Sequence, residues 1–158
     1  MTQPSTQALS LRPVREDELP LLGTLLAELD GTPPLPLERL QATWRAIHRY
    51  PDYQCYFAER DGEVIGSLSM IVFPVFAHDL ASEAIIEAVV IRPAFRGIGL
   101  GREMIRAAMQ IAAQRGAYKL ALSSNLRRLD AHRFYDGMGF ARHGYSFHID
   151  TRAEALAE

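Results

Sequence analysis

Apolar residues recur along the chain at two spacings, one typical of helices and one typical of strands. Leucines fall at helical spacing over residues 19–29, directly after acidic residues at 16–18, and apolar residues repeat in the same way over 37–48. β-Branched and aromatic residues fill 53–59 and 63–73, which flank an Asp-Gly turn. We therefore predict two helices followed by an antiparallel hairpin.

The second half of the chain alternates between extended and helical patterns. These patterns predict a loop at 74–82, a strand at 84–91, a helix at 99–115, a strand at 118–123, a short helix at 129–138 and a final strand at 140–150. Pro93 ends the strand before it, because the residue preceding a proline is held extended and proline lacks a backbone donor. With a short first strand at 8–12, this order predicts an α+β fold on a mostly antiparallel sheet.

Composition indicates one globular domain. The 158 residues are 48% apolar and 23% charged, enough to bury a core without a disulfide or a metal. We expect a single domain over residues 1–158, with its core at 8–150 and frayed ends at 1–7 and 151–158. A net charge of -2 leaves no basic excess to neutralise a phosphate backbone, so nucleic acid is not an expected partner.

Cysteine usage and hydropathy bear on the compartment. The one cysteine, Cys55, excludes an internal disulfide and fits a reducing compartment. No apolar run approaches the ~20 residues of a membrane span, and residues 1–13 lack the apolar core of a signal peptide. We expect a cytoplasmic protein without a membrane partner. The histidines show no metal-ligand spacing, so no metal is expected either.

The segment Arg-Gly-Ile-Gly-Leu-Gly-Arg at 96–102 joins a predicted strand to a predicted helix through three alternate glycines. Several backbone N–H groups converge there at the positive end of a helix, and no Cβ atoms block a close approach. This pattern predicts a cradle for a pyrophosphate, with Arg96 or Arg102 adding charge. The alternative is a glycine-rich helix start that binds nothing.

Two other nucleotide motifs do not fit this turn. A dinucleotide-binding fingerprint needs G-x-G-x-x-G, but Arg102 stands at its last position, and no acidic residue follows the next strand to hold a ribose. A P-loop needs Gly-Lys followed by Ser or Thr, whereas Gly101 is followed by Arg102 and Glu103. The sequence therefore does not favour a dehydrogenase, a kinase or an NTPase.

Two segments resemble motifs of the GCN5-related N-acetyltransferase (GNAT) superfamily. Residues 96–101 match its cofactor motif Arg/Gln-x-x-Gly-x-Gly/Ala, and residues 131–140 match its later A-x-x-[FL]-Y-x-x-x-G-F motif, about 35 residues on. The resemblance extends over about residues 8–150. It implies an α+β fold with a mixed, mostly antiparallel sheet of six to seven strands flanked by about four helices. It also implies transfer of an acetyl group from acetyl-CoA to an amine.

The resemblance also implies which residues bind the cofactor. A strand N–H near Val89 or Val90, freed by the β-bulge that the family carries there, would meet the thioester oxygen. Arg128 replaces the asparagine that many relatives carry seven residues before the motif tyrosine; it would reach a cofactor phosphate or an acidic group on the acceptor. The expected cofactor-binding residues are Val89, Val90, Ile91, Arg96, Gly97, Ile98, Gly99, Leu100, Gly101, Arg102 and Arg128.

Acetyl transfer to an amine needs a base, because an alkylamine with a pKa near 10 arrives protonated. Glu87 is the first choice, acting through water, since apolar neighbours in its strand would raise its pKa by desolvation. Glu83 is the substitute, because strand parity places it, with Ile85 and Val89, on the same face. Alternatively, Glu87 lies on a solvated sheet face or pairs with an arginine.

Tyr135 is the expected acid, because the family motif places its phenol beside the cofactor sulfur, where it can protonate the leaving thiolate. The alternative is a tyrosine that anchors its helix to the sheet. His132, three residues earlier on one helix face, is expected to be a surface histidine; alternatively it would orient Tyr135 or touch the acceptor. Cys55 lies in an apolar strand without an adjacent base, so we expect a buried structural thiol rather than an acyl-cysteine nucleophile.

Residues outside the cofactor motif bear on the acceptor. Arg127, Arg128 and Arg133 point to a small-molecule primary amine that also bears a carboxylate or phosphonate, with residues 31–37 and the aromatic loop 73–79 contributing to specificity. A protein N-terminus or lysine is an alternative acceptor, and a CoA-binding sensor without catalysis is a second alternative. An exposed sheet edge near 145–149 would allow a homodimer.

Overall fold

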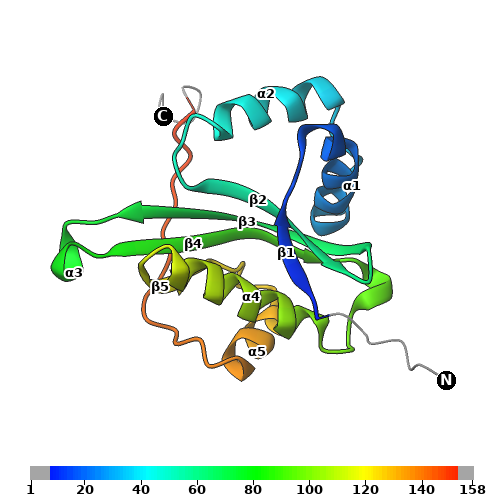
Figure 1. Cartoon of the computed structure of the whole chain (residues 1–158). Helices are drawn as coiled ribbons and strands as arrows, with labels where there is room; N and C mark the ends of the chain where they lie inside the picture. The colour runs from blue at the N-terminus through cyan, green and yellow to red at the C-terminus, as the bar shows by residue number, and fades with distance from the viewer. Residues whose placement is uncertain (1–7, 153–158) are drawn as a thin grey trace. The chain divides into compact units, whose positions relative to one another are not determined.

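The computed structural model describes residues 8–152, which divide into two compact units between Leu122 and Ser123. The first unit holds a mixed five-stranded sheet in the order β1-β2-β3-β4-β5 (Figure 1). Its strands are β1 (Ser10–Pro13), β2 (Tyr53–Arg60), β3 (Glu63–Pro74), β4 (Ser82–Ile91) and β5 (Ala117–Ala121). The first four strands are antiparallel and β5 pairs with β4 in parallel. The predicted α+β class and the predicted hairpin at Asp61-Gly62 are confirmed.

Helices cover both faces of this sheet (Figure 1). On one face lie the 3-10 turn η1 (Glu16–Glu18), α1 (Leu19–Asp30) and α2 (Leu37–Ile47). Their buried leucines pack with Cys55, Phe57 and Val90 of the sheet. On the other face lies α4 (Leu100–Gln114), whose buried side chains include Met104 and Ile105. The sheet between them is therefore buried on both sides over much of its area.

A β-bulge interrupts β4. Ser67 pairs with Val90 and Ser69 pairs with Glu87, so two residues of β4, Ala88 and Val89, lie opposite one residue of β3. Ala88 has a φ of 50°. The extra residue reverses the alternation of faces, so that Val90, and not Val89 as strand parity predicts, shares a face with Glu87.

The predicted loop at 74–82 contains a single helical turn, α3 (Ala77–Leu80). Three of its residues, His78, Asp79 and Leu80, have φ between 54° and 60°, so the turn is left-handed inside. No propensity pattern predicts such a turn, because non-glycine residues rarely adopt this conformation. A second 3-10 turn, η2, spans Pro93–Phe95. With α5 (Leu129–Gly137), the described residues hold five α-helices, one more than expected.

The predicted strand at 140–150 is wrong, and the sheet has five strands in the described residues instead of six to seven. This segment has neither strand nor helix, and the alternate side chains Tyr145, Phe147 and Ile149 are 90%, 89% and 78% exposed. Alternating apolar residues favour an extended backbone, but a strand also needs a neighbour that supplies main-chain hydrogen bonds. The expectation of frayed ends concerns residues that, apart from 151 and 152, lie outside the described part of the chain.

Candidate active site

The glycine turn follows β4 directly. β4 ends at Ile91, η2 redirects the chain, and α4 begins at Leu100. Gly97 and Gly99 have φ of 78° and 89°, a left-handed conformation that side chains rarely adopt. A Cβ atom built on either glycine would meet nothing within 4 Å, so the turn presents its main chain to open space.

Main-chain donors gather at this turn. The N–H groups of Arg102 and Glu103 both donate to the carbonyl of Gly99, at 3.0 and 3.3 Å, and close the first turn of α4. The amides just before them have no carbonyl one turn back to accept their hydrogen bonds. They lie at the positive end of a 15-residue helix, which favours an anion. The geometry therefore suits a pyrophosphate.

The side chains around the turn divide into structural and exposed ones. Arg96 donates its Nε–H to the carbonyl of Ile91 at 2.8 Å and fixes the turn to the end of β4. Leu100 and Val90 are buried in the core, so only their main chains can face a ligand. Ile98 is exposed.

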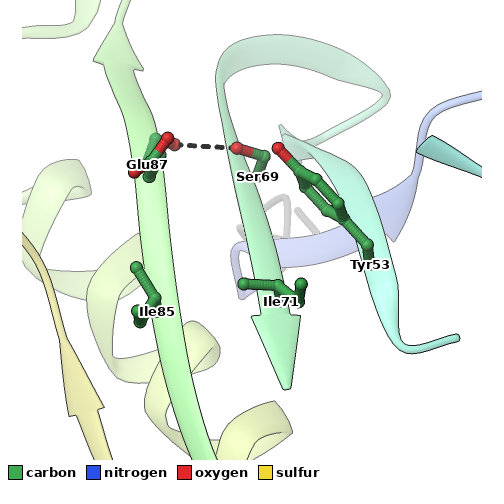
Figure 2. Close-up of a pocket in the computed structure, with 5 residues that line it drawn as sticks. All are labelled: Tyr53, Ser69, Ile71, Ile85 and Glu87. Carbon is green, nitrogen blue, oxygen red and sulfur yellow. Dashed lines mark hydrogen bonds between the residues drawn. The ribbon is translucent and has the colours of Figure 1, made fainter. Parts of the chain in front are cut away.

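A pocket of about 220 Å³ opens on the sheet face that carries α1 and α2 (Figure 2). Five residues line it, one from β2 and two each from β3 and β4: Tyr53, Ser69, Ile71, Ile85 and Glu87. Strand register arranges them in two adjacent rows. Tyr53, Ile71 and Ile85 form one row, and Ser69 and Glu87 form the next. The pocket is therefore apolar along one row and polar along the other.

Glu87 lines this pocket, as a base for the reaction would need to, but its surroundings differ from the expected ones. The side chain is exposed, and it is not enclosed by the apolar residues that flank it along the strand. Its neighbours in sequence point to the opposite face, where Ile86 is buried. On its own face the hydroxyl of Ser69 donates to the main-chain carbonyl of Glu87 at 3.3 Å.

Glu83, the expected substitute for Glu87, is held by other groups. Its carboxylate pairs with the Lys119 ammonium at 3.1 Å and accepts a hydrogen bond from the Tyr118 hydroxyl at 3.0 Å. The hydrogen bond from Lys119 lowers the pKa of Glu83, with a smaller contribution from Tyr118. A carboxylate that is already paired and has a lowered pKa is a weak base, so the geometry favours Glu87.

Tyr53 and Ser69 were not predicted as site residues. The phenol of Tyr53 lies beside the Ser69 hydroxyl (Figure 2). Burial raises the pKa of Tyr53, and a hydrogen bond with Ser69 opposes this. The hairpin register around Asp61-Gly62 is the sequence feature that could have placed both residues beside β4.

The second unit contains α5 with Tyr135. The Tyr135 ring lies 5.1 Å from the Phe134 ring and 5.4 Å from the Phe140 ring, both in edge-on contact. Burial raises the pKa of Tyr135, and the charge of Arg128 partly offsets this. Arg128 is the residue just before the first turn of α5.

The loop before α5 is organised by Asn125. Its side-chain oxygen accepts from the N–H of Arg127 at 2.9 Å, and its carbonyl bonds to Nε2 of His132 at 2.9 Å. His132 thus contacts this loop. Arg133 forms an ion pair with Asp130.

Three further features that the sequence raised are a cysteine, metal sites and membrane spans, and Cys55 does not line the pocket. Cys55 is buried, as predicted, and burial raises the pKa of its thiol to about 11. Across residues 8–152, no three His, Cys, Asp or Glu side chains come together as metal ligands. Within the same residues, no helix is both long enough and apolar enough to span a bilayer.

Comparison with known proteins gives consistent matches. The model of the Acetyltransferase (GNAT) family matches residues 17–140. A glucosamine 6-phosphate N-acetyltransferase from Trypanosoma brucei brucei is 30% identical over 145 residues, which are 90% of this chain and 95% of that protein. An aminoalkylphosphonate N-acetyltransferase from Salmonella typhimurium is 34% identical over 98 residues, 61% of this chain and 62% of that protein. The crystal structure of a Trypanosoma brucei acetyltransferase superposes with a TM-score of 0.75 at 29% identity, covering 90% of this chain and 99% of that one.

Proposed function

The chain belongs to the acetyltransferase (GNAT) family, and from this premise we propose that it moves an acetyl group from acetyl-CoA to the primary amine of a small molecule. The amine attacks the thioester directly in a ternary complex. The observation that carries the proposal is the glycine turn between β4 and α4, where left-handed glycines leave main-chain donors open at a helix start. The relatives named above act on small amines, glucosamine 6-phosphate and aminoalkylphosphonates.

The residues present fit coenzyme A. Gly97, Ile98, Gly99, Leu100 and Gly101 offer amides to the diphosphate, and an added Cβ at Gly97 or Gly99 would occupy the space that the diphosphate needs. Other residues extend this site in the proposal: Val89, Val90 and Ile91 through the strand, and Arg96, Arg102 and Arg128 through charge. Acetyl-CoA supplies an activated acetyl group as its thioester.

Glu87 takes a proton from the acceptor. The acceptor arrives as an ammonium ion, and Glu87, exposed in the pocket, accepts its proton through a water molecule. The bulge at Ala88 supports a second role for this strand, because two residues there lie opposite one. A main-chain N–H freed at Val89 or Val90 would then stabilise negative charge on the thioester oxygen.

Tyr135 supplies a proton to the departing sulfur. In the reaction a carbon–nitrogen bond forms, the carbon–sulfur bond breaks, and the phenol proton passes to the thiolate. Nitrogen loses two protons: Glu87 receives one and releases it to water, and the other restores the Tyr135 phenol, so the net products are an amide, a thiol and one proton. The raised pKa of Tyr135 supports this role, because the phenol keeps its proton at neutral pH.

Two alternative functions, a protein acetyltransferase and a CoA sensor, would require different features of the site. A protein N-terminus or lysine as acceptor would need an open groove, whereas the sheet carries a pocket of about 220 Å³ that five residues line. A sensor that binds CoA without catalysis would not need Glu87 to line such a pocket. The small-molecule transferase therefore accounts for the most features of the site.

The test is turnover of an amine panel, read as release of free thiol from acetyl-CoA. We expect saturable turnover of at least one small primary amine, and acetyl-CoA should raise the melting temperature. Glu87→Gln should lower kcat by about 100-fold or more, because a general base contributes about 10²- to 10⁴-fold. Glu83→Gln is the matched control and should retain most activity. A melting shift with no turnover of any amine would favour the sensor.

A further inference from the structure

The polar row of the pocket presents hydrogen-bond acceptors. An ionised Glu87 carboxylate accepts only. The Ser69 hydroxyl has a single proton, and it donates that proton to the main-chain carbonyl of Glu87 at 3.3 Å (Figure 2). The lone pairs of the Ser69 oxygen are therefore left for other partners.

Tyr53 lies in the adjacent row and adds a third oxygen atom to these acceptors. Its phenol oxygen lies beside the Ser69 hydroxyl (Figure 2), and a hydrogen bond with Ser69 lowers the pKa of Tyr53. A phenol oxygen can accept hydrogen bonds, so Tyr53, which lines the pocket, offers an acceptor to a ligand there. Burial raises the pKa of Tyr53, so the phenol is uncharged at neutral pH.

We propose that Tyr53, Ser69 and Glu87 together form a subsite for a primary ammonium group. The inference rests on the proposed function and makes it more specific. An ammonium group offers three N–H donors, which match three acceptors here: Tyr53 and Ser69 directly, and Glu87 through a water molecule. Ile71 and Ile85, in the adjacent row, take the carbon atoms that bear the amine.

The charge of the pocket restricts which amines fit. None of the five lining residues is cationic, and one of them is the Glu87 carboxylate. A carboxylate or phosphonate on the amine-bearing carbon would lie against Glu87 with no positive side chain of the pocket to neutralise it. The acceptor class is therefore an aliphatic primary amine whose anionic group, where present, is remote from the amine.

The first experiment compares matched acceptors on the wild-type protein. Isobutylamine, valine and 1-amino-2-methylpropylphosphonate share one skeleton and differ only in the group beside the amine, and 3-aminopropylphosphonate carries its anion at a distance. We expect kcat/KM to be at least about 10-fold higher for isobutylamine and for 3-aminopropylphosphonate than for the two compounds with an adjacent anion. A preference for valine or for its phosphonate analogue overturns the proposal.

The second experiment separates acceptor binding from structural effects. Tyr53→Phe and Ser69→Ala should each raise the KM of the best amine about 10-fold or more, with kcat changed less than about threefold and the KM of acetyl-CoA unchanged. Tyr56→Phe is the control, because Tyr56 is buried in the same strand on the opposite face. An unchanged amine KM in Tyr53→Phe overturns the subsite.

These outcomes also separate the subsite from the proposed function. If the wild-type protein turns over amines but shows neither the predicted acceptor preference nor the KM effect, the subsite is wrong and the transferase stands. If the wild-type protein binds acetyl-CoA and turns over no amine, the transferase is wrong and the subsite falls with it.

Discussion

Ala88 holds a left-handed backbone conformation in the middle of β4, with a φ of 50°. For a residue with a Cβ atom this costs about 1–3 kcal/mol, and such strain gathers at functional sites. Here it coincides with the bulge that follows Glu87. The same residue thus breaks the alternation of the strand and lies next to the proposed base.

Tyr135 gives a prediction at the residue scale. Tyr135→Phe removes only the phenol hydroxyl, so the Kd of acetyl-CoA should stay within about twofold while kcat falls about 10- to 100-fold. Because burial raises the pKa of Tyr135, wild-type kcat should not decline with rising pH until above pH ~10. The exposed Tyr145 provides the control Tyr145→Phe, which should match wild type. Unchanged turnover in Tyr135→Phe would remove the phenol from the mechanism.

Single residues differ in how far the sequence could identify them. The alternate glycines at 97 and 99 could be predicted to form an open turn, because a left-handed φ and a helix start leave a local pattern. Tyr53 and Ser69 leave none, since their neighbourhood depends on strands paired across the sheet. The setting of Glu87 was mispredicted for a related reason, because its sequence neighbours face the other side of the sheet.

At the scale of elements, Arg12 joins β1 to η1 and β2. Its guanidinium donates two hydrogen bonds to Glu18, at 2.9 and 2.8 Å, and a third to Glu59 at 2.5 Å. Glu18 also accepts from the N–H of Arg15 at 3.0 Å. These bonds fix the start of α1 and so help to hold the helix layer over the face that carries the pocket.

Glu18→Gln tests this junction through pH. The hydrogen bonds from Arg12 lower the pKa of Glu18 from 4.5 to about 2. A lowered folded pKa stabilises the fold above the unfolded pKa, and this contribution is lost as pH falls towards 2. Glu18→Gln should therefore cost about 1–2 kcal/mol of unfolding free energy at pH 7, and the difference should shrink between pH 4.5 and 2.

Chemical denaturation across this pH range measures the effect. The exposed neighbour Glu16 supplies the control Glu16→Gln, which should change stability by less than about 0.5 kcal/mol at every pH. A difference for Glu18→Gln that stays constant from pH 7 to pH 2 would contradict the assigned role.

Elements with a local pattern were predicted and elements that depend on partners were not. Helix α4 and the β2–β3 hairpin follow from periodicity and a turn, and their bounds lie within one or two residues of the prediction. The bulge at Ala88 came only from family resemblance. The segment 140–150 has the alternation of a strand without a strand beside it.

At the scale of the molecule, the proposed reaction uses residues from both units. Glu87 and the glycine turn belong to the first unit, whereas Tyr135 and Arg128 belong to the second. We propose that the two units work as one acetyltransferase domain. We also propose that the chain forms a homodimer through the exposed apolar side chains at 145–149.

The central claim is that the turn between β4 and α4 binds the diphosphate of coenzyme A, and calorimetric titration with CoA tests it most directly. Gly99→Glu places a carboxylate in the turn, whereas Gly116→Glu places one after α4 at a glycine of similar conformation, with φ of 80° against 89°. Both positions leave a new Cβ in open space, so backbone strain is matched. We predict that wild type and Gly116→Glu bind CoA alike and that Gly99→Glu shows no binding. Binding by Gly99→Glu with wild-type affinity, or no heat with the wild-type protein, would contradict the account.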